Sequence, residues 1–89
     1  MKHPFDNFRS LFPKLSDHVH LAACSGSALA LPVAKAVDEY QNGLLTAGAD
    51  WKAHLDKMDE TKEKFARLIG AEKEEIAVLP SVSDAVAAV

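Results

Sequence analysis

The sequence predicts a mainly α-helical unit with one or two short strands. Two long stretches repeat apolar side chains with the period of a helix, and a shorter N-terminal stretch does the same. Two brief apolar runs have the length of single strands. The 89 residues are predicted to form a single unit whose small core offsets the entropy of folding only narrowly.

The first predicted helix covers residues 4–12. Phe5, Phe8 and Phe12 recur at helical spacing along this stretch, which makes one of its faces apolar. Pro13 follows directly and is placed to end the helix. The sequence therefore predicts a short amphipathic helix at the N-terminus.

An extended segment is predicted next. Residues 14–17 have the composition of a turn, and the alternation around Val19 then favours a strand over residues 18–23. The small residues of 24–31 predict a loop whose backbone can approach another group closely.

A long helix is predicted from Pro32 to Gly48. Proline suits the first turn of a helix, where its missing N–H costs no hydrogen bond, and glycine suits the end. Gly43 weakens the helix from within. The apolar residues that share one face are Val33, Ala36, Val37, Tyr40 and Leu44.

A second long helix is predicted between Asp50, a good N-cap, and Gly70, a good terminating residue. At about 1.5 Å per residue it is roughly 30 Å long. The large apolar residues Trp51, Met58 and Phe65 are predicted to lie in a core or an interface. The full apolar stripe consists of Trp51, Leu55, Met58, Phe65, Leu68 and Ile69.

The C-terminal part begins with a charged turn over residues 71–75 and continues with an apolar run over residues 76–79, which predicts a buried strand. Pro80 then breaks the strand. Ser83 is predicted to cap a last helix that begins at Asp84.

Composition excludes several classes of protein. The net charge is −3, from 10 basic and 13 acidic residues, and no basic cluster is dense enough to neutralise a series of phosphates, so nucleic-acid binding is not expected. No apolar run approaches the roughly 20 residues of a membrane span. The N-terminus lacks the apolar core of a signal peptide, and the single cysteine cannot form an internal disulfide. These features predict a cytoplasmic protein that does not enter a membrane.

The turn at residues 80–83 is a candidate anion site. A strand followed by a helix start presents consecutive backbone N–H groups and a serine hydroxyl in one place, and this combination suits a phosphate. The alternative is an ordinary turn in which Ser83 serves only as a cap.

Other candidate residues have plain structural alternatives. His18 and His20 would face the same side of a strand and could share a metal with His54, but two histidines without a third at motif spacing do not predict a metal site. Cys24 is predicted to be a small buried thiol rather than a nucleophile. Four acidic residues of the second long helix are predicted to form surface ion pairs and not a catalytic pair, namely Asp56, Asp59, Glu60 and Glu63.

Three segments together resemble the N-terminal part of one enzyme family. They read HVHLAACSGSALALPVAKAV, ADWKAHLDKMDETKEKFARLIGAEKEEIAVLP and PSVSDAVAAV, in this order. Their order and spacing are similar to the opening strand, loop, helices and cofactor turn of the class V aminotransferase and cysteine desulfurase family, the pyridoxal-phosphate enzymes of fold type I. The resemblance implies that the chain is an N-terminal slice of an α/β transferase fold and an incomplete segment of a larger enzyme.

The resemblance also implies site residues. In that family the turn after the strand binds the phosphate of pyridoxal phosphate, which places backbone amides on Val82 and Ser83, a hydroxyl on Ser83, and Ser81 beside them. Ser83 stands for the family's threonine and keeps its hydroxyl. The small-residue loop near the substrate corresponds here to Ala22, Ala23 and Cys24.

Departures from the family pattern limit what is implied. Leu21 stands where many members have an asparagine that binds the substrate carboxylate, which argues against a standard cysteine desulfurase, and Val82 stands where a small residue is usual. The Schiff-base lysine, the aspartate at the pyridine nitrogen and the ring-stacking histidine belong to later parts of the family fold. These 89 residues alone are therefore predicted to bind no cofactor and to be inactive.

Two functions remain open. In the first, the chain supplies part of the phosphate site and of the dimer contact to a pyridoxal-phosphate enzyme. In the second, it is a stand-alone helical protein that acts by self-association or by binding a partner. Both predict a homo-oligomer, because the apolar faces of the long helices would otherwise stay exposed.

Overall fold

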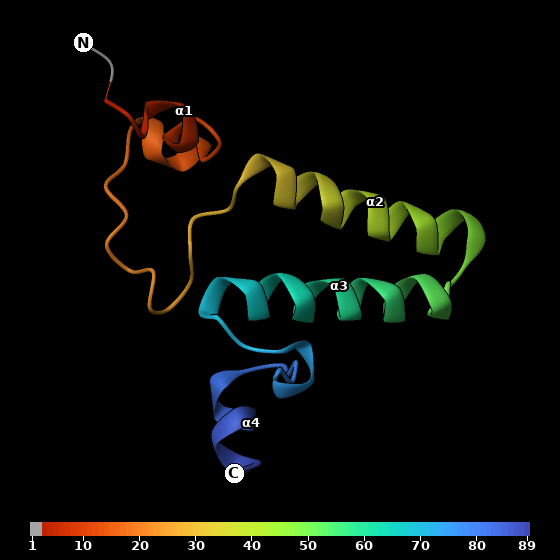
Figure 1. The fold of residues 1–89 in the computed structure, drawn as a ribbon. Coiled ribbons are helices and arrows are strands. Elements are labelled where there is room, and N and C mark those ends of the chain that lie inside the picture. The colour runs from red at the N-terminus through yellow and green to blue at the C-terminus, as the bar shows by residue number, and fades with distance from the viewer. Residues whose placement is uncertain (1–2) are drawn as a thin grey trace. The chain divides into compact units, whose positions relative to one another are not determined.

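A computed structural model describes residues 3–89, and among these residues it contains helices and no β-strand (Figure 1). The chain divides into two compact units, the first ending at Ala49 and the second beginning at Asp50. The first unit contains α1 (Asp6–Arg9), the 3₁₀ helix η1 (Pro13–Ser16) and α2 (Leu31–Ala47). The second contains α3 (Trp51–Ile69), η2 (Lys73–Glu75) and α4 (Val82–Ala87). The predicted mainly helical character is confirmed.

The N-terminal helix α1 is shorter than the predicted span of 4–12. Phe5 precedes it without a side-chain cap, so the first turn lacks the hydrogen bond that usually extends a helix start. The chain then turns into η1, which begins at Pro13. A guanidinium nitrogen of Arg9 donates to the carbonyl of Leu15 at 2.7 Å and ties the two short helices together.

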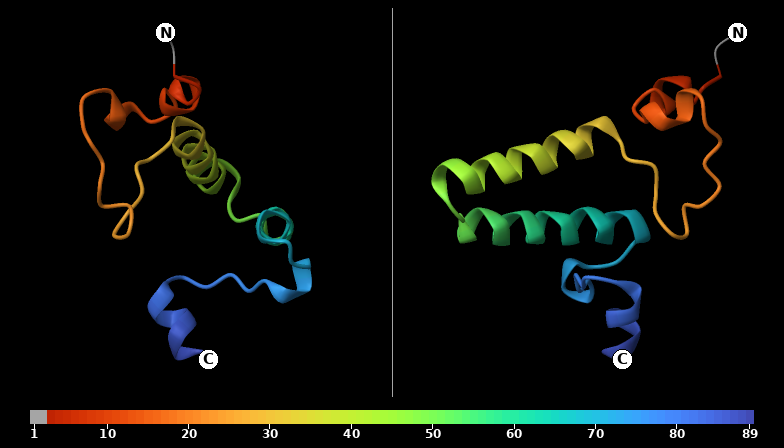
Figure 2. Two further views of the ribbon diagram at one scale, coloured as in Figure 1. Left: turned by 60° about the vertical axis from the view of Figure 1, so that its left-hand side comes forward. Right: turned by 180° about the vertical axis from the view of Figure 1, so that it is seen from behind.

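The predicted strand over residues 18–23 is wrong. These residues follow an irregular course, which both views of Figure 2 show. No strand lies in the described part of the chain to pair with them, and an unpaired strand leaves its backbone N–H and C=O groups without partners. Val19 and Leu21 are exposed, so the alternation does not mark a buried face. The loop predicted after it continues to Ala30.

Both ends of α2 agree with the prediction to within one residue. Pro32 lies in the first turn, and Gly48 follows the last residue with a φ of 79°, a backbone conformation that favours glycine. The Leu31 N–H donates to the Leu11 carbonyl at 2.8 Å, which connects the start of α2 to the N-terminal segment.

Both ends of α3 are also confirmed. The Asp50 carboxylate accepts from the Ala53 N–H at 3.1 Å, as an N-cap does. Gly70 ends the helix in the left-handed conformation with a φ of 72°, and the Ala71 N–H then donates to the Ala66 carbonyl at 2.8 Å. Local capping residues thus set the length of this helix.

The apolar stripe of α3 does not form a core in the described chain. Trp51 is 72% exposed and Phe65 is 49% exposed, and Met58 is exposed as well. Among residues 3–89 the buried apolar core consists of Ala66 alone. The core alternative for these large side chains is therefore wrong, whereas the interface alternative stays a prediction.

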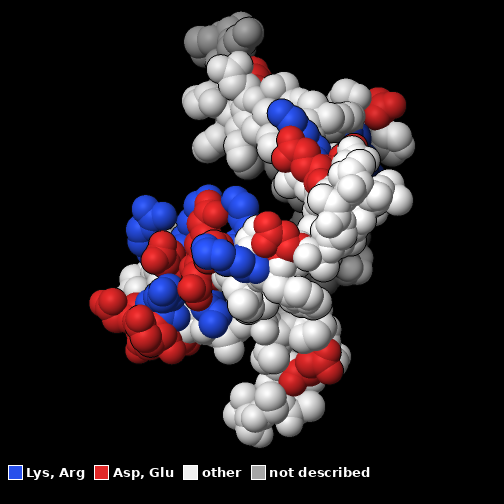
Figure 3. Space-filling model, turned by 90° about the vertical axis from the view of Figure 1, so that its right-hand side faces the viewer, with Lys and Arg blue, Asp and Glu red and all other residues white. Residues whose placement is uncertain are grey.

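Three of the four acidic residues predicted to form surface ion pairs on α3 do so, whereas the ion pairs of the described residues do not include Asp59. Lysine and acidic side chains alternate over part of the surface in Figure 3. Glu60 lies between two lysines, with Lys64 Nζ at 2.8 Å and Lys57 Nζ at 3.0 Å from its carboxylate oxygens. Lys52 pairs with Asp56 at 2.7 Å. Glu63 lies 4.0 Å from the ammonium of Lys73.

The pair of lysines around Glu60 predicts an acid-sensitive helix. Hydrogen bonds from Lys64 and Lys57, with their positive charges, lower the pKa of Glu60 from 4.5 to about 2. Because the pKa of Glu60 is lower in the folded chain than in the unfolded chain, the ionised carboxylate stabilises α3 at pH values above 4.5. This stabilisation is lost as the pH falls from 4.5 toward 2. We expect the helical circular dichroism signal to fall over that range, and to fall less in Glu60→Gln. An equal acid response in both proteins would contradict this assignment.

The predicted strand over residues 76–79 is also wrong. Ile76 has extended φ and ψ angles, but no partner strand lies beside it in the part of the chain that the structure describes. The charged turn before it is the 3₁₀ helix η2. Its ends are held by a capping box in which the Glu72 N–H donates to the Glu75 carboxylate at 2.8 Å.

The last helix, α4, is capped by Ser81 and not by the predicted Ser83. An N-cap hydroxyl accepts from the amide three residues later, and the Ser81 Oγ accepts from the Asp84 N–H at 3.1 Å. Ser81 has the extended φ of a cap residue, −158°. Within residues 3–89, no helix has both the length and the apolar character that crossing a membrane requires.

Candidate functional site

The first candidate site is the start of α4. The Ser81 hydroxyl accepts from the Asp84 amide and also donates to the Asp84 carboxylate at 3.1 Å, so the cap occupies this side chain. The amides of Val82 and Ser83 lie in the first turn, where a helix provides no intrahelical acceptor. Both residues are exposed. Their two N–H groups and the Ser83 hydroxyl are thus the accessible donors of this turn.

These donors suit part of a phosphate site. Phosphate oxygens accept from backbone amides and from hydroxyl groups, which are the groups that Val82 and Ser83 present. The Asp84 carboxylate brings negative charge to the same turn, but it contacts the Ser81 hydroxyl at 3.1 Å. Two amides and one hydroxyl would satisfy only part of the acceptor oxygens of a phosphate. The assignment of Ser81, Val82 and Ser83 to a cofactor stays a prediction.

The second candidate site is the loop that contains Ala22, Ala23 and Cys24. The Ala22 carbonyl accepts from the Ser25 N–H at 3.0 Å and from the Gly26 N–H at 3.2 Å. The Ser25 hydroxyl also donates to it at 3.0 Å. These bonds close residues 22–26 into a turn. Its proposed nearness to a substrate stays a prediction.

Cys24 is exposed, so the prediction of a buried thiol is wrong. Small size and low polarity favour burial of cysteine, but only where surrounding elements cover it. Here the thiol lies in a tight surface turn. The sequence near it contains no signal that distinguishes these two outcomes.

The imidazole of His20 does not lie on a strand, and both of its nitrogens have partners. Its Nε2 lies 2.9 Å from the Gly26 carbonyl, and its Nδ1 lies 3.2 Å from the Lys14 ammonium. Its neighbour His18 contacts the Asp17 carboxylate at 2.7 Å. No group of three potential metal ligands occurs in residues 3–89. The spacing of the histidines alone does not indicate these partners.

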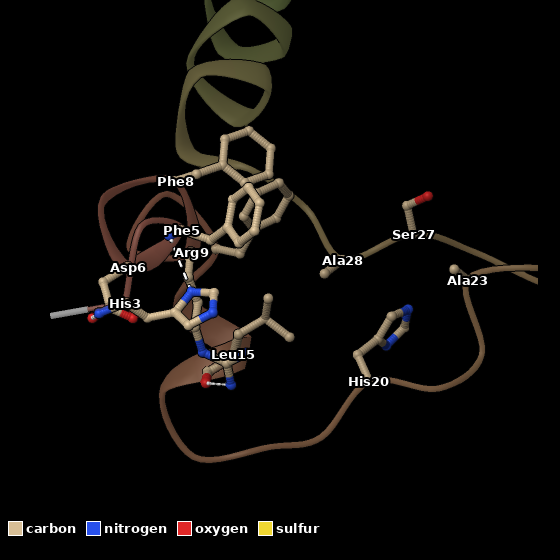
Figure 4. A pocket seen from close by; sticks show the side chains of 11 residues that line it. His3, Phe5, Asp6, Phe8, Arg9, Leu15, His20, Ala23, Ser27 and Ala28 are labelled. Atoms are coloured by element: carbon tan, nitrogen blue, oxygen red, sulfur yellow. Dashed lines mark hydrogen bonds between the residues drawn. The ribbon is translucent and has the colours of Figure 1, made fainter.

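A cavity of about 650 Å³ lies beside this loop in the first unit. Figure 4 shows His20 and Ala23 on one side of it, with the rings of Phe5 and Phe8 and the side chain of Leu15 on the other. The rings of Phe8 and Phe12 stand edge to face, 5.3 Å apart between centroids. The helical spacing of these phenylalanines predicted an apolar face but not the cavity that it lines.

The two candidate sites belong to different units. The start of α4 provides hydrogen-bond donors for an anion. The loop of residues 22–26 lies beside an apolar cavity.

Comparison with known proteins finds a similarity to the N-terminal part of an aminotransferase. No protein-family model matches the chain. No solved structure matches it. The chain is 47% identical over all 89 residues to the uncharacterized aminotransferase YcbU of Bacillus subtilis (strain 168), and it spans 24% of the length of that relative. The chain is thus similar, over its whole length, to the N-terminal part of an aminotransferase.

Proposed function

We propose that these residues serve as the N-terminal part of a pyridoxal-phosphate-dependent enzyme of the class V aminotransferase type. The observation that carries this proposal is the 47% identity over the whole chain to an aminotransferase. In such an enzyme the segment contributes part of the cofactor phosphate site and part of the dimer contact. The groups that carry out the reaction come from the rest of the enzyme.

The phosphate role falls on the start of α4. The amides of Val82 and Ser83 and the hydroxyl of Ser83 donate to phosphate oxygens, while Ser81 holds the turn in shape through its bond to Asp84. Pyridoxal phosphate, when bound, supplies an electron sink for reactions at the carbon beside an amino group. The residues of this chain hold and orient its phosphate and carry no proton in the reaction.

The loop of Ala22, Ala23 and Cys24 has the second role. Small side chains allow a substrate to approach the backbone closely, and the hydrogen bonds to the Ala22 carbonyl close this loop into a turn. Leu21 precedes the loop and presents an apolar side chain where many class V enzymes bind a carboxylate. We therefore propose a substrate that is held by its carboxylate through other residues.

Complementation tests this function directly. The 89-residue chain is co-expressed with the C-terminal three quarters of YcbU. We expect the two parts to copurify and to bind pyridoxal phosphate, which is measured by its visible absorbance and by the phosphate content of the denatured protein. Each part alone should retain little cofactor, because neither holds the whole phosphate site. Equal cofactor retention with and without the 89-residue chain, or no association between the two parts, would contradict the proposal.

The exposed stripe of α3 favours a dimer contact. Trp51, Leu55, Met58 and Phe65 leave one side of the helix apolar and in contact with water, and such a surface usually belongs to an interface. The same observation favours the second candidate function, a stand-alone helical protein that self-associates. In either function we propose a second copy of this chain as the partner.

Light scattering tests self-association. We expect a mass above the 9.6 kDa of the single chain, and a mass that falls toward this value in Phe65→Gln. Burying a phenylalanine contributes about 1.5–3 kcal/mol, so its loss should weaken association roughly tenfold to a hundredfold. The matched control is Asp59→Gln, on the same helix outside the stripe, which should leave association unchanged. A monomer at every concentration would rule out this contact.

A further inference from the structure

We infer that His20 is a positioning residue that holds the loop of residues 22–26 closed through the backbone of Gly26, with Lys14 fixing its ring. The inference concerns the candidate substrate loop, and its role in an enzyme rests on the proposed function. It differs from a metal-binding role because both ring nitrogens are already engaged.

The two contacts assign the tautomer of the ring. A lysine ammonium has three N–H donors and no acceptor, so the Nδ1 of His20, 3.2 Å from Lys14 Nζ, accepts a hydrogen bond. The Nε2, 2.9 Å from the Gly26 carbonyl oxygen, must then carry the proton and donate. Together these two bonds require the neutral imidazole with its proton on Nε2.

The ring and the internal turn of the loop bind different backbone groups of Gly26. The Gly26 N–H donates to the Ala22 carbonyl at 3.2 Å, and the Gly26 carbonyl accepts from His20 at 2.9 Å. Gly26 is therefore held by both of its backbone groups. Since residues 18–23 form no strand, these bonds take the place of a sheet ladder in ordering the segment.

Protonation of His20 would remove one of the two bonds. With a proton on each nitrogen, Nδ1 would become a donor facing the Lys14 ammonium, and two positive charges would oppose each other. The other titratable or charged groups that line the adjoining cavity are His3, Asp6 and Arg9 (Figure 4). Arg9 donates to the Leu15 carbonyl at 2.7 Å, and the Asp6 carboxylate accepts from the His3 N–H at 2.7 Å. The closed loop therefore belongs to the neutral form of His20.

NMR on the 89-residue chain tests this inference. At pH 8 we expect the ring ¹⁵N signals of His20 to report the tautomer with its proton on Nε2, and the backbone order parameters of Ser25 and Gly26 to lie near the rigid value of about 0.85. In His20→Ala the order parameters should fall below about 0.6.

A conservative variant separates the two hydrogen bonds from the ring itself. The amide of glutamine in His20→Gln can donate to Gly26 and accept from Lys14, so the loop should stay ordered. His18→Gln, which changes the neighbouring imidazole, is the matched control and should leave the loop as ordered as in the unmodified chain. Equal loop order in the unmodified chain and in His20→Ala, a flexible loop at pH 8, or a proton on Nδ1 would overturn the inference.

The outcome is independent of cofactor binding. A failure of complementation with the C-terminal part of YcbU would leave the order parameters of Ser25 and Gly26 unaffected. Conversely, a loop that is flexible at pH 8 would leave the phosphate role of Ser83 untouched. The two failures are thus distinguishable.

Discussion

Replacing Gly70 by alanine is expected to destabilise α3 by about 1–2 kcal/mol, because a residue with a Cβ is strained in the left-handed backbone conformation. Gly70 has a φ of 72°, and nothing lies within 4 Å of the position that an added Cβ would take. The strain is therefore confined to the backbone. Urea-induced loss of the helical circular dichroism signal measures the change.

Gly43→Ala is the matched control with the opposite sign. Gly43 lies inside α2, away from any positive φ, and an added Cβ there also meets nothing within 4 Å. Alanine restricts the unfolded chain more than glycine does, so this change should stabilise α2 by about 0.5–1 kcal/mol. A shift of stability in the same direction in both variants would contradict the left-handed backbone conformation of Gly70.

Ser81→Ala and Ser83→Ala are expected to separate the helix cap from the phosphate contact. The Ser81 hydroxyl accepts from the Asp84 amide, so its loss should cost α4 about 1 kcal/mol. That cost would fray a helix of six residues. The Cα chemical shifts of residues 82–87 measure the fraying. Ser83→Ala should leave these shifts helical, because the Ser83 hydroxyl does not cap α4.

The cofactor responds differently to the two changes. In the complemented enzyme, Ser83→Ala removes one hydroxyl donor to a charged phosphate, a hydrogen bond worth about 1.5–3 kcal/mol, and should weaken cofactor retention at least tenfold. Ser81→Ala should weaken it only through the shape of the turn. Unchanged retention in Ser83→Ala would remove this residue from the proposed phosphate site.

The long helices could be predicted because their signals are local. Pro32 and Gly48 bound α2, and Asp50 and Gly70 bound α3, within one residue of the expected ends. Each signal depends on the φ angle or the hydrogen-bonding groups of one residue and needs no distant contact. The ion pairs on α3 follow from the same short-range geometry, since residues four apart share a face.

Local signals could not show that the two predicted strands do not form. An alternating or apolar run becomes a strand only when another strand satisfies its backbone, and none lies beside residues 18–23 or 76–79 in the described chain. The sequence also predicts the cap of α4 two residues too late, at Ser83 instead of Ser81, for a related reason. Both Ser81 and Ser83 have a suitable hydroxyl, and the backbone path after Pro80 decides between them.

The amino-acid sequence by itself determined the helical content, the bounds of α2 and α3 and the likeness to an aminotransferase. The tertiary structure alone decided that Cys24 is exposed, that Ser81 is the cap, and that His20 holds Gly26. The physical reason is the distance along the sequence over which each interaction acts. Capping and helical periodicity act within a few residues of sequence, whereas exposure and side-chain hydrogen bonds depend on which surfaces the folded backbone brings together.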